Sequence, residues 1–398
     1  MKQRRKVGLV ELYGHNEVLY ILYRLLKNDF EVSVWTTNGI RKDAENYFEK
    51  ELKNWYGQLE KESKEQFMKR HFSQLNEQHI LIFITLISSY QFFANTTFRA
   101  KTILIVHNVN TMLYSKGNFR LDKSSFQHFI FDLLRLGRDK FQRVNFYKKK
   151  LLQSMDYISF ASPTLSNYAK SITNEYDKKI IAPLPFGFYE DEKEETQKRD
   201  TIIISIPGAV MQRARDYKML YDVMAQVIPT TKKKVCLQLL GNSENESGKN
   251  IIKFFKKLES DNFQLVYFQQ SLAQKEFDSF LRNTDFMILP LHKYRKFGLC
   301  QEVIGLSGIS GGLNDILRFG IPALVTKDYS VEKEISPLID YFADKNELQE
   351  ILQEWIDDSI YIAIRKRGKL YLNDFDQQKT TFQVVKILND ILSKKQDE

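Results

Sequence analysis

Short apolar runs alternate with amphipathic segments along the first half of the chain. Residues 7–12 are apolar enough for a buried strand, and 17–27 carry apolar residues at helical spacing. The alternation then repeats, which is typical of a parallel α/β sheet. We expect further strands at 31–36, 80–86, 102–107 and 155–160, and helices around Tyr90 and over 163–171. The highly charged segment 41–75 is predicted to be mainly helical and solvent-facing.

The pattern breaks at 181–187, where the sequence IAPLPFG contains two prolines, and a charged segment follows at 190–199. Proline pairs disfavour helix, so we place a domain boundary here. A second α/β series then begins. Its expected strands are 201–206, 234–240, 263–268, 286–291 and 323–326, and its expected helices are 217–227, 250–257, 274–282, 346–355 and 359–393. The predicted division is a first domain of 1–187, a second of 188–370, and a C-terminal helix of 371–398 that returns to the first domain.

Composition favours two folded cores and anionic partners. Of the 398 residues, 43% are hydrophobic and 13% aromatic, which supports real cores rather than disorder. Lys and Arg number 59 against 50 Asp and Glu, and the net charge of +9 favours nucleotides or phospholipid head groups. The basic residues are dispersed and no recognition module is present, so we expect no nucleic-acid partner. Cys236 and Cys300 lie in apolar surroundings, which indicates a reduced, cytoplasmic chain.

Neither a secretory signal nor a membrane span is predicted. The basic start of the chain is followed by an apolar run that covers only residues 7 to 12 and is interrupted by Glu11. The strongest apolar run, 80–87, is far shorter than the ~20 residues of a spanning helix. We therefore expect a protein that is soluble or lies on a membrane surface.

A glycine-rich loop leads into a short helix at 307–322, with the sequence SGISGGLNDILRFGIP. Its small residues let backbone N–H groups approach an anion closely, and the helix N-terminus adds partial positive charge. Gly320 and Pro322 end the helix. The segment therefore fits phosphate binding, although a glycine-rich loop can also serve only as a turn between two elements.

Three motifs of the second half follow one another in a recognisable order. Gly208 lies in the turn after the strand 201–206 and is followed by Arg213-Ala-Arg215. Asp285 precedes an apolar run that ends in Pro290, and the glycine-rich loop comes last. With two α/β halves and a proline-containing linker, this order resembles the glycosyltransferase family four group of GT-B architecture and its bacterial surface-polysaccharide relatives. The resemblance covers roughly 201–326, whereas the first half agrees mainly in pattern. It implies two doubly wound Rossmann-like domains facing a cleft, with acceptor-side 1–187, nucleotide-sugar-binding 188–370, and C-terminal helices packing back.

The resemblance also implies a donor site. Arg215, with Arg213 as second choice, would bind the diphosphate, and the loop amides would hold its distal phosphate; each arginine could instead be a solvated loop cation. The donor-binding set is Gly208, Arg213, Arg215, Ser307, Gly308, Gly311, Gly312, Leu313 and Asp315. The expected donor is a UDP- or GDP-linked sugar. This arrangement requires no cofactor and no metal.

The donor loop departs from the family pattern at its opening. The retaining family has a glutamate there and a second one eight positions later, where this chain has Ser307 and Asp315. Asp315 keeps a carboxylate that could accept from a ribose hydroxyl, but Ser307 cannot replace a charge. The retaining mechanism is therefore not carried over, and the stereochemistry stays open.

Two histidines follow expected strands and are the catalytic candidates. His15 lies in the loop after the first strand, where several inverting GT-B enzymes place their base, and a near-neutral pKa suits that role. His107 ends the strand 102–107, and the resemblance suggests a contact to donor-sugar hydroxyls. Either could instead be structural, and Glu17 is an alternative base. The remaining histidines show no metal-ligand spacing, which argues against a zinc site; they are His71, His79, His128 and His292.

Segment 135–150 carries seven basic residues against one acidic residue, a net charge of +6, and apolar residues interleave with them over 126–150. This suits a helix beside an anionic membrane or a lipid-linked acceptor, or equally a helix with a solvated basic face.

Taken together, the motifs predict a nucleotide-sugar-dependent, hexosyltransferase-type glycosyltransferase. It would act on a glycan or lipid-linked acceptor in bacterial cell-surface polysaccharide assembly, in the cytoplasm or peripherally on the inner face of the membrane. The alternative is a non-catalytic nucleotide- or glycan-binding or scaffold protein on the same fold.

Overall fold

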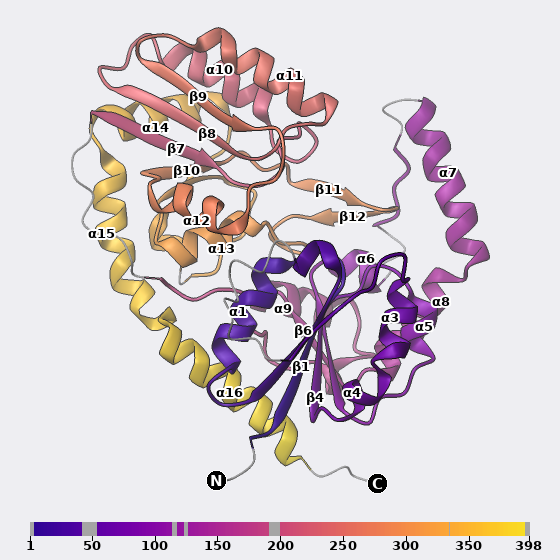
Figure 1. Cartoon of the computed structure of the whole chain (residues 1–398). Coiled ribbons are helices and arrows are strands. Elements are labelled where there is room, and N and C mark those ends of the chain that lie inside the picture. The colour runs from indigo at the N-terminus through magenta and orange to yellow at the C-terminus, as the bar shows by residue number, and fades with distance from the viewer. Residues whose placement is uncertain are drawn as a thin grey trace. The chain divides into compact units, whose positions relative to one another are not determined.

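The computed structural model describes residues 4–41, 54–113, 118–122, 126–190, 200–333 and 335–394. The chain forms two compact units (Figure 1). Unit 1 comprises Met1–Phe186, Lys296–Ile309 and Gln378–Glu398; unit 2 comprises Gly187–Arg295 and Ser310–Gln377. The segment 296–309, which the sequence division assigned to the second domain, therefore belongs to unit 1. Segments 42–53, expected to be mainly helical, and 191–199, part of the charged segment after the prolines, lie outside the described residues.

A six-stranded parallel sheet forms the centre of unit 1, in the order β3-β2-β1-β4-β5-β6. Its strands are β1 Lys6–Glu11, β2 Glu31–Thr36, β3 Trp55–Gly57, β4 Ile80–Thr85, β5 Lys101–Val106 and β6 Tyr157–Phe160. The central strand β4 is buried along its whole length, as expected for a strand covered on both faces. β3 lies within the segment predicted to be mainly helical, and its three half-buried residues are too few to show a periodic pattern.

Helices cover this sheet, and some of them begin at a side chain that caps the helix. Ser162, for example, accepts a hydrogen bond from Leu165 N at 3.3 Å, and Pro163 is the first residue of α9. The helices of at least five residues whose bounds lie within the described residues are α1 Asn16–Leu26, α3 Lys64–Arg70, α4 Phe72–Asn76, α5 Tyr90–Ala94, α6 Val109–Leu113, α7 Phe126–Phe141, α8 Val144–Ser154, α9 Pro163–Ile172 and α16 Gln377–Ser393. The last of these joins unit 1 from Gln378 onward.

Unit 2 repeats the architecture, with the strand order β14-β13-β10-β7-β8-β9 and parallel pairing. Its strands are β7 Thr201–Ile206, β8 Lys234–Asn242, β9 Phe263–Phe268, β10 Phe286–Leu289, β13 Ala323–Thr326 and β14 Ile339–Phe342. Its helices are α10 Tyr217–Val227, α11 Glu246–Phe255, α12 Gln274–Arg282, α13 Gly311–Phe319, α14 Lys345–Asp357 and α15 Ile360–Leu372. The prediction of two doubly wound α/β units is thus confirmed.

Three strands of the second half were not predicted. β11 (Tyr294–Phe297) and β12 (Cys300–Val303) form a two-stranded sheet, and β14 is an edge strand of the large sheet. Each has four residues with polar side chains among them, so none shows the continuous apolar run that marks a buried strand.

Several polar side chains buried inside unit 2 are paired. Arg318 on α13 is only 1% exposed, and its guanidinium lies 3.0 Å from Asp278 and 3.3 Å from Glu190. Asp285, one of the residues of the sequence motif, accepts a hydrogen bond from Ile203 N at 2.8 Å, and Arg365 donates to its carbonyl at 2.7 Å. Asp285 therefore ties β10 to β7 and α15, which is a structural role. No helix among the described residues is both long and apolar enough to cross a bilayer.

Removing the Arg318 charge should destabilise unit 2 strongly. Arg318→Met leaves two carboxylates in the interior without this cation, and breaking a buried pair costs about 3–5 kcal/mol. Lys293→Met is the control, because Lys293 and Asp328 form a solvent-exposed pair that contributes at most about 1 kcal/mol. Denaturant unfolding monitored by fluorescence should show the large loss only for Arg318→Met; equal losses would contradict this account.

Candidate functional site

The carboxyl edge of the unit 1 sheet carries a cluster of ionisable side chains. Glu11 is the last residue of β1 and pairs in register with Thr85, the last residue of β4. His107 directly follows β5, the next strand along the sheet. Because parallel strands all end at one edge, these three residues converge although they are far apart in sequence.

The loop after β1 is shaped by a buried carboxylate. Glu11 Oε1 accepts hydrogen bonds from Tyr13 N at 2.6 Å and Gly14 N at 3.0 Å. Gly14 has a φ of +118°, a conformation that suits glycine. This turn delivers His15 as the N-cap residue of α1, and its side chain makes no capping hydrogen bond. The imidazole is therefore directed to other partners.

The two catalytic candidates of the sequence analysis meet in this cluster. The rings of His15 and His107 are stacked, with centroids 4.2 Å apart. His15 Nδ1 lies 2.6 Å from Thr85 Oγ1, and His107 Nε2 lies 2.8 Å from Ile84 O. A carbonyl oxygen only accepts, so His107 carries its proton on Nε2 and donates to Ile84. His107 is thereby held in one tautomer, against which His15 stacks.

Burial shifts the pKa of each ionisable member toward its neutral form. It lowers the pKa of His15, and it lowers the pKa of His107 to about 3, with the neighbouring His15 as a second cause. Burial also raises the pKa of Glu11, although the N–H donors of Tyr13 and Gly14 act in the opposite direction. Near neutral pH, both histidines are neutral and His15 can accept a proton.

A second cluster occurs in unit 2 at the turn after β7. Gly208 has a φ of +83°, and a Cβ there would lie 2.6 Å from the Arg215 guanidinium. Gly241 is equally constrained, because its Cβ would lie 2.0 Å from Gly208 O. Backbone and guanidinium are thus packed together where only glycine fits. Arg215 is buried, donates to Ala209 O at 3.3 Å, and its Nε makes no hydrogen bond within the described chain.

Three arginines share this part of unit 2. Burial lowers the pKa of Arg295, and the positive charges of Arg215 and Arg213 lower it further. Arg213 is exposed, whereas Arg295 is half-buried. Guanidinium groups close enough to disfavour one another's charge are stabilised by a bound anion, so the cluster suits a diphosphate.

The first turn of α13 lies beside the same turn. A Cβ on Gly312 would be 2.9 Å from Leu289 and 3.3 Å from Pro207, the residue before Gly208. Ser310 is the N-cap residue, and Leu313 and Asp315 are buried in the helix. Unit 2 therefore contains the following predicted donor residues: Gly208, Arg213, Arg215, Gly311, Gly312, Leu313 and Asp315.

Ser307 and Gly308 lie in unit 1 rather than with this set. Ser307 is fully buried, and its hydroxyl accepts from Val303 N at 2.8 Å and from Asn110 Nδ2 at 3.0 Å. Gly308 forms a β-bridge with Asn108. Both residues contribute to packing within unit 1, so they belong to a different unit from the other predicted donor residues.

Comparison with known proteins supports the architecture. No family model and no curated protein sequence matches the chain. Among solved structures, Anabaena HepE in complex with UDP-glucose has a TM-score of 0.61 at 12% identity, covering 97% of this chain and 99% of that one. Pneumococcal O-GlcNAc transferase GtfA, in complex with UDP and GlcNAc, has a TM-score of 0.57 at 9% identity, with 98% and 100% covered. UDP-GlcNAc 2-epimerase from Methanocaldococcus jannaschii has a TM-score of 0.53 at 11% identity, with 97% and 99% covered. The fold is GT-B.

Three candidate site residues of this GT-B chain were not predicted from the sequence: Glu11, Thr85 and Arg295. Glu11 had a detectable signal, because the cost of burying a carboxylate inside an otherwise apolar strand must be offset by hydrogen bonds or an opposite charge. Thr85 and Arg295 had none, since each acquires a role only through a neighbour far away in sequence. No group of three His, Cys, Asp or Glu side chains close enough to hold a metal ion occurs in the described part of the chain.

The low pKa of His107 should make stability depend on pH. Below pH 6.5, the ordinary pKa of histidine, His107 becomes protonated in the unfolded chain but stays neutral in the folded chain. The free energy of unfolding therefore decreases as the pH falls from 6.5 toward 3. His107→Gln, which retains a donor for Ile84 O, removes this dependence. The stability difference between the native protein and the variant should shrink by roughly 2 kcal/mol from pH 7.5 to pH 5. Denaturant midpoints measure it, and a difference independent of pH would contradict the assignment.

Proposed function

We propose that this protein is a nucleotide-sugar-dependent glycosyltransferase that transfers a hexosyl group from a UDP- or GDP-linked donor to a glycan or lipid-linked acceptor. The observation that carries the proposal is the arginine cluster beside Gly208 and the α13 N-terminus. A departing nucleoside diphosphate needs cationic and N–H stabilisation, and this cluster offers both. Similar structures that contain UDP-glucose, or UDP and GlcNAc, support the same class of ligand.

In this proposal each residue of unit 2 has a defined task. Arg215, with Arg213 and Arg295 nearby, stabilises the negative charge that develops on the diphosphate. The backbone N–H groups at Gly311, Gly312 and Leu313 bind its distal phosphate. Asp315 accepts from a ribose hydroxyl. No step of this arrangement uses a metal ion.

Unit 1 supplies the proton acceptor in the inverting form of the reaction. A neutral His15, oriented by Thr85 and by the stacked His107, removes the proton of the acceptor hydroxyl. His107 is a positioning residue here, because its own Nε2 proton is committed to Ile84 O. Glu11 acts through the backbone of the loop that carries His15.

We place the reaction in bacterial cell-surface polysaccharide assembly, in the cytoplasm or on the inner face of the membrane. The two cysteines are buried free thiols, which suits a reducing compartment. The rival is a non-catalytic nucleotide- or glycan-binding protein of the same fold. It is favoured by Ser307, which stands where related transferases carry a carboxylate.

Loss of Arg215 should weaken donor binding. Arg215→Ala removes a charge-assisted contact of roughly 1.5–3 kcal/mol, so affinity for UDP or GDP should fall about tenfold or more. Asp315→Ala should lower nucleotide affinity more than it lowers stability. Isothermal titration against UDP, GDP and their sugars measures both effects.

Lys218→Ala is the control for these titrations, because Lys218 is an exposed cation on α10 only three residues away in sequence. Its affinity should equal that of the native protein. If the folded native protein binds none of these nucleotides, the proposed function is wrong. If Arg215→Ala and Asp315→Ala both keep native affinity, the donor site is assigned to the wrong residues.

Loss of His15 should slow the chemical step without affecting the donor. His15→Ala should lower the turnover rate by roughly 10²–10⁴ and leave donor affinity nearly unchanged. His107→Gln should have a smaller effect, and Glu17→Gln is the variant that tests the alternative base. Full turnover by His15→Ala, or a product of retained anomeric configuration, would remove His15 from catalysis.

A further inference from the structure

Helix α7 (Phe126–Phe141) in unit 1 exposes its apolar side chains. Its only buried residue is Asp132, whose carboxylate accepts from Asp122 N at 2.6 Å and forms an ion pair with Lys296. In contrast, Phe126 is 79%, Leu134 65% and Phe141 89% exposed. A surface helix of a globular protein normally buries its apolar face, so α7 has the opposite orientation.

The exposed residues form a continuous stripe along α7. At ~100° per residue, Phe126, Ile130, Leu134 and Phe141 fall within an arc of about 80°. Arg138 and Lys140 flank this arc on its two sides, and both are exposed. An apolar stripe bordered by cations is the arrangement by which a helix lies in the interface of an anionic bilayer.

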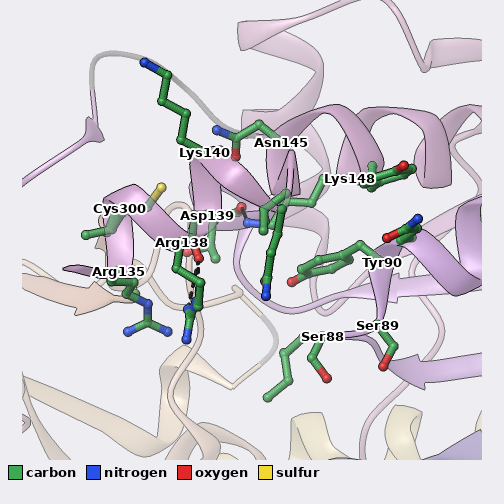
Figure 2. A pocket seen from close by; sticks show the side chains of 18 of the residues that line it. Ser88, Ser89, Tyr90, Arg135, Arg138, Asp139, Lys140, Asn145, Lys148 and Cys300 are labelled. Atoms are coloured by element: carbon green, nitrogen blue, oxygen red, sulfur yellow. Dashed lines mark hydrogen bonds and ion pairs between the residues drawn. The ribbon is translucent and has the colours of Figure 1, made fainter. Parts of the chain in front are cut away.

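A cavity of about 920 Å³ adjoins the C-terminal half of α7, entirely within unit 1. Four cations and two acids line it, namely Arg135, Arg138, Lys140 and Lys148 with Glu65 and Asp139. Figure 2 shows that Arg135 and Arg138 extend toward the same side of α7, as residues three apart on a helix do. Arg138 pairs with Asp139 at 2.9 Å, whereas Arg135 and Lys140 form no ion pair with any described residue.

The inner wall of the cavity holds a buried ammonium group. Lys148 on α8 is 8% exposed, donates to Thr111 O at 2.8 Å, and lies over the Tyr90 ring at 5.2 Å from its centroid (Figure 2). Its burial lowers the pKa of Lys148. An ammonium has three donors, and Thr111 O is the acceptor that the described residues offer Lys148, so a bound anion would stabilise this ammonium.

We infer that unit 1 binds a membrane lipid with a phosphate-bearing head group: the phosphate enters the cavity, and the apolar chain lies along the stripe of α7. Charge complementarity and the joint presence of stripe and cavity on one helix carry this inference. Asn108, which directly follows His107, also lines the cavity. The cavity therefore reaches the residue next to the positioning histidine of unit 1, and the identity of the lipid as the sugar acceptor rests on the proposed function.

The test is co-sedimentation of the full chain with vesicles of phosphatidylcholine alone, or of phosphatidylcholine with phosphatidylglycerol or phosphatidic acid. Binding should require the anionic lipid and weaken at high salt. Arg135→Gln combined with Arg138→Gln should reduce binding about 25-fold, at roughly fivefold per cation lost. Ile130→Ser combined with Leu134→Ser should reduce it at least about tenfold.

Matched controls carry the same changes elsewhere on the surface. Lys249→Gln with Lys253→Gln removes two exposed cations of α11, and Leu370→Ser with Phe382→Ser removes two exposed apolar residues; both should bind vesicles like the native protein. Equal binding to neutral and anionic vesicles, or native binding by both α7 variants, would overturn the inference. So would a stripe variant that changes only the oligomeric state, because a second copy would then cover α7.

Nucleotide titration of the same variants separates this inference from the proposed function. The α7 variants should keep native affinity for UDP and GDP, since every residue of the arginine cluster belongs to unit 2. Nucleotide binding without vesicle binding would refute the lipid site alone. Vesicle binding without any nucleotide binding would refute the proposed function and leave the lipid site standing.

Discussion

Every strand of a parallel sheet ends at the same edge, and this constraint determines where each unit can carry chemistry. In unit 1 it brings Glu11, Thr85 and His107 together from three strands. In unit 2 it places Gly208, after β7, beside the α13 turn that follows a much later part of the chain. The loops can differ between the two units because the sheets, not the loops, supply the stability. The candidate functional residues therefore lie at these edges, whereas Asp285 at the opposite end of β10 has a structural role.

Buried charged side chains differ in their partners between the structural and the candidate functional parts of the molecule. Arg318 has two carboxylates within 3.3 Å, so its desolvation is compensated inside the protein. Arg215 is also buried, but Ala209 O is the partner of its guanidinium in the described chain, and its positive charge acts against that of the neighbouring Arg295. A cluster of this kind is costly by itself and becomes favourable when an anion binds. The same reasoning applies to Lys148 in unit 1, where the exposed stripe of α7 adds an apolar component to the expected ligand.

Hydrophobic patterning predicted most of the fold because long buried strands and amphipathic helices are local features. The bounds of β7, β9, α10 and α12 agree with the sequence prediction to the residue. Short strands with polar residues, such as β11 and β14, were missed because their pairing partners determine them. The same limit applies to the site: His15 was identified from its position after a strand, but its stacking on His107 and the contribution of Arg295 depend on contacts across the fold. Ser307 was grouped with the donor loop by sequence, although its hydroxyl is used within unit 1.

The proposed function requires sugar transfer, and the release of nucleoside diphosphate is its most direct test. The purified full chain is incubated with UDP- and GDP-sugars, with and without vesicles that contain phosphate-bearing lipids or soluble glycans, and both the nucleotide and the sugar product are analysed. The account predicts release of UDP or GDP together with a glycosylated acceptor, and no comparable release when the acceptor is omitted. Tight nucleotide binding without any product, or a donor whose sugar is only epimerised, would contradict it.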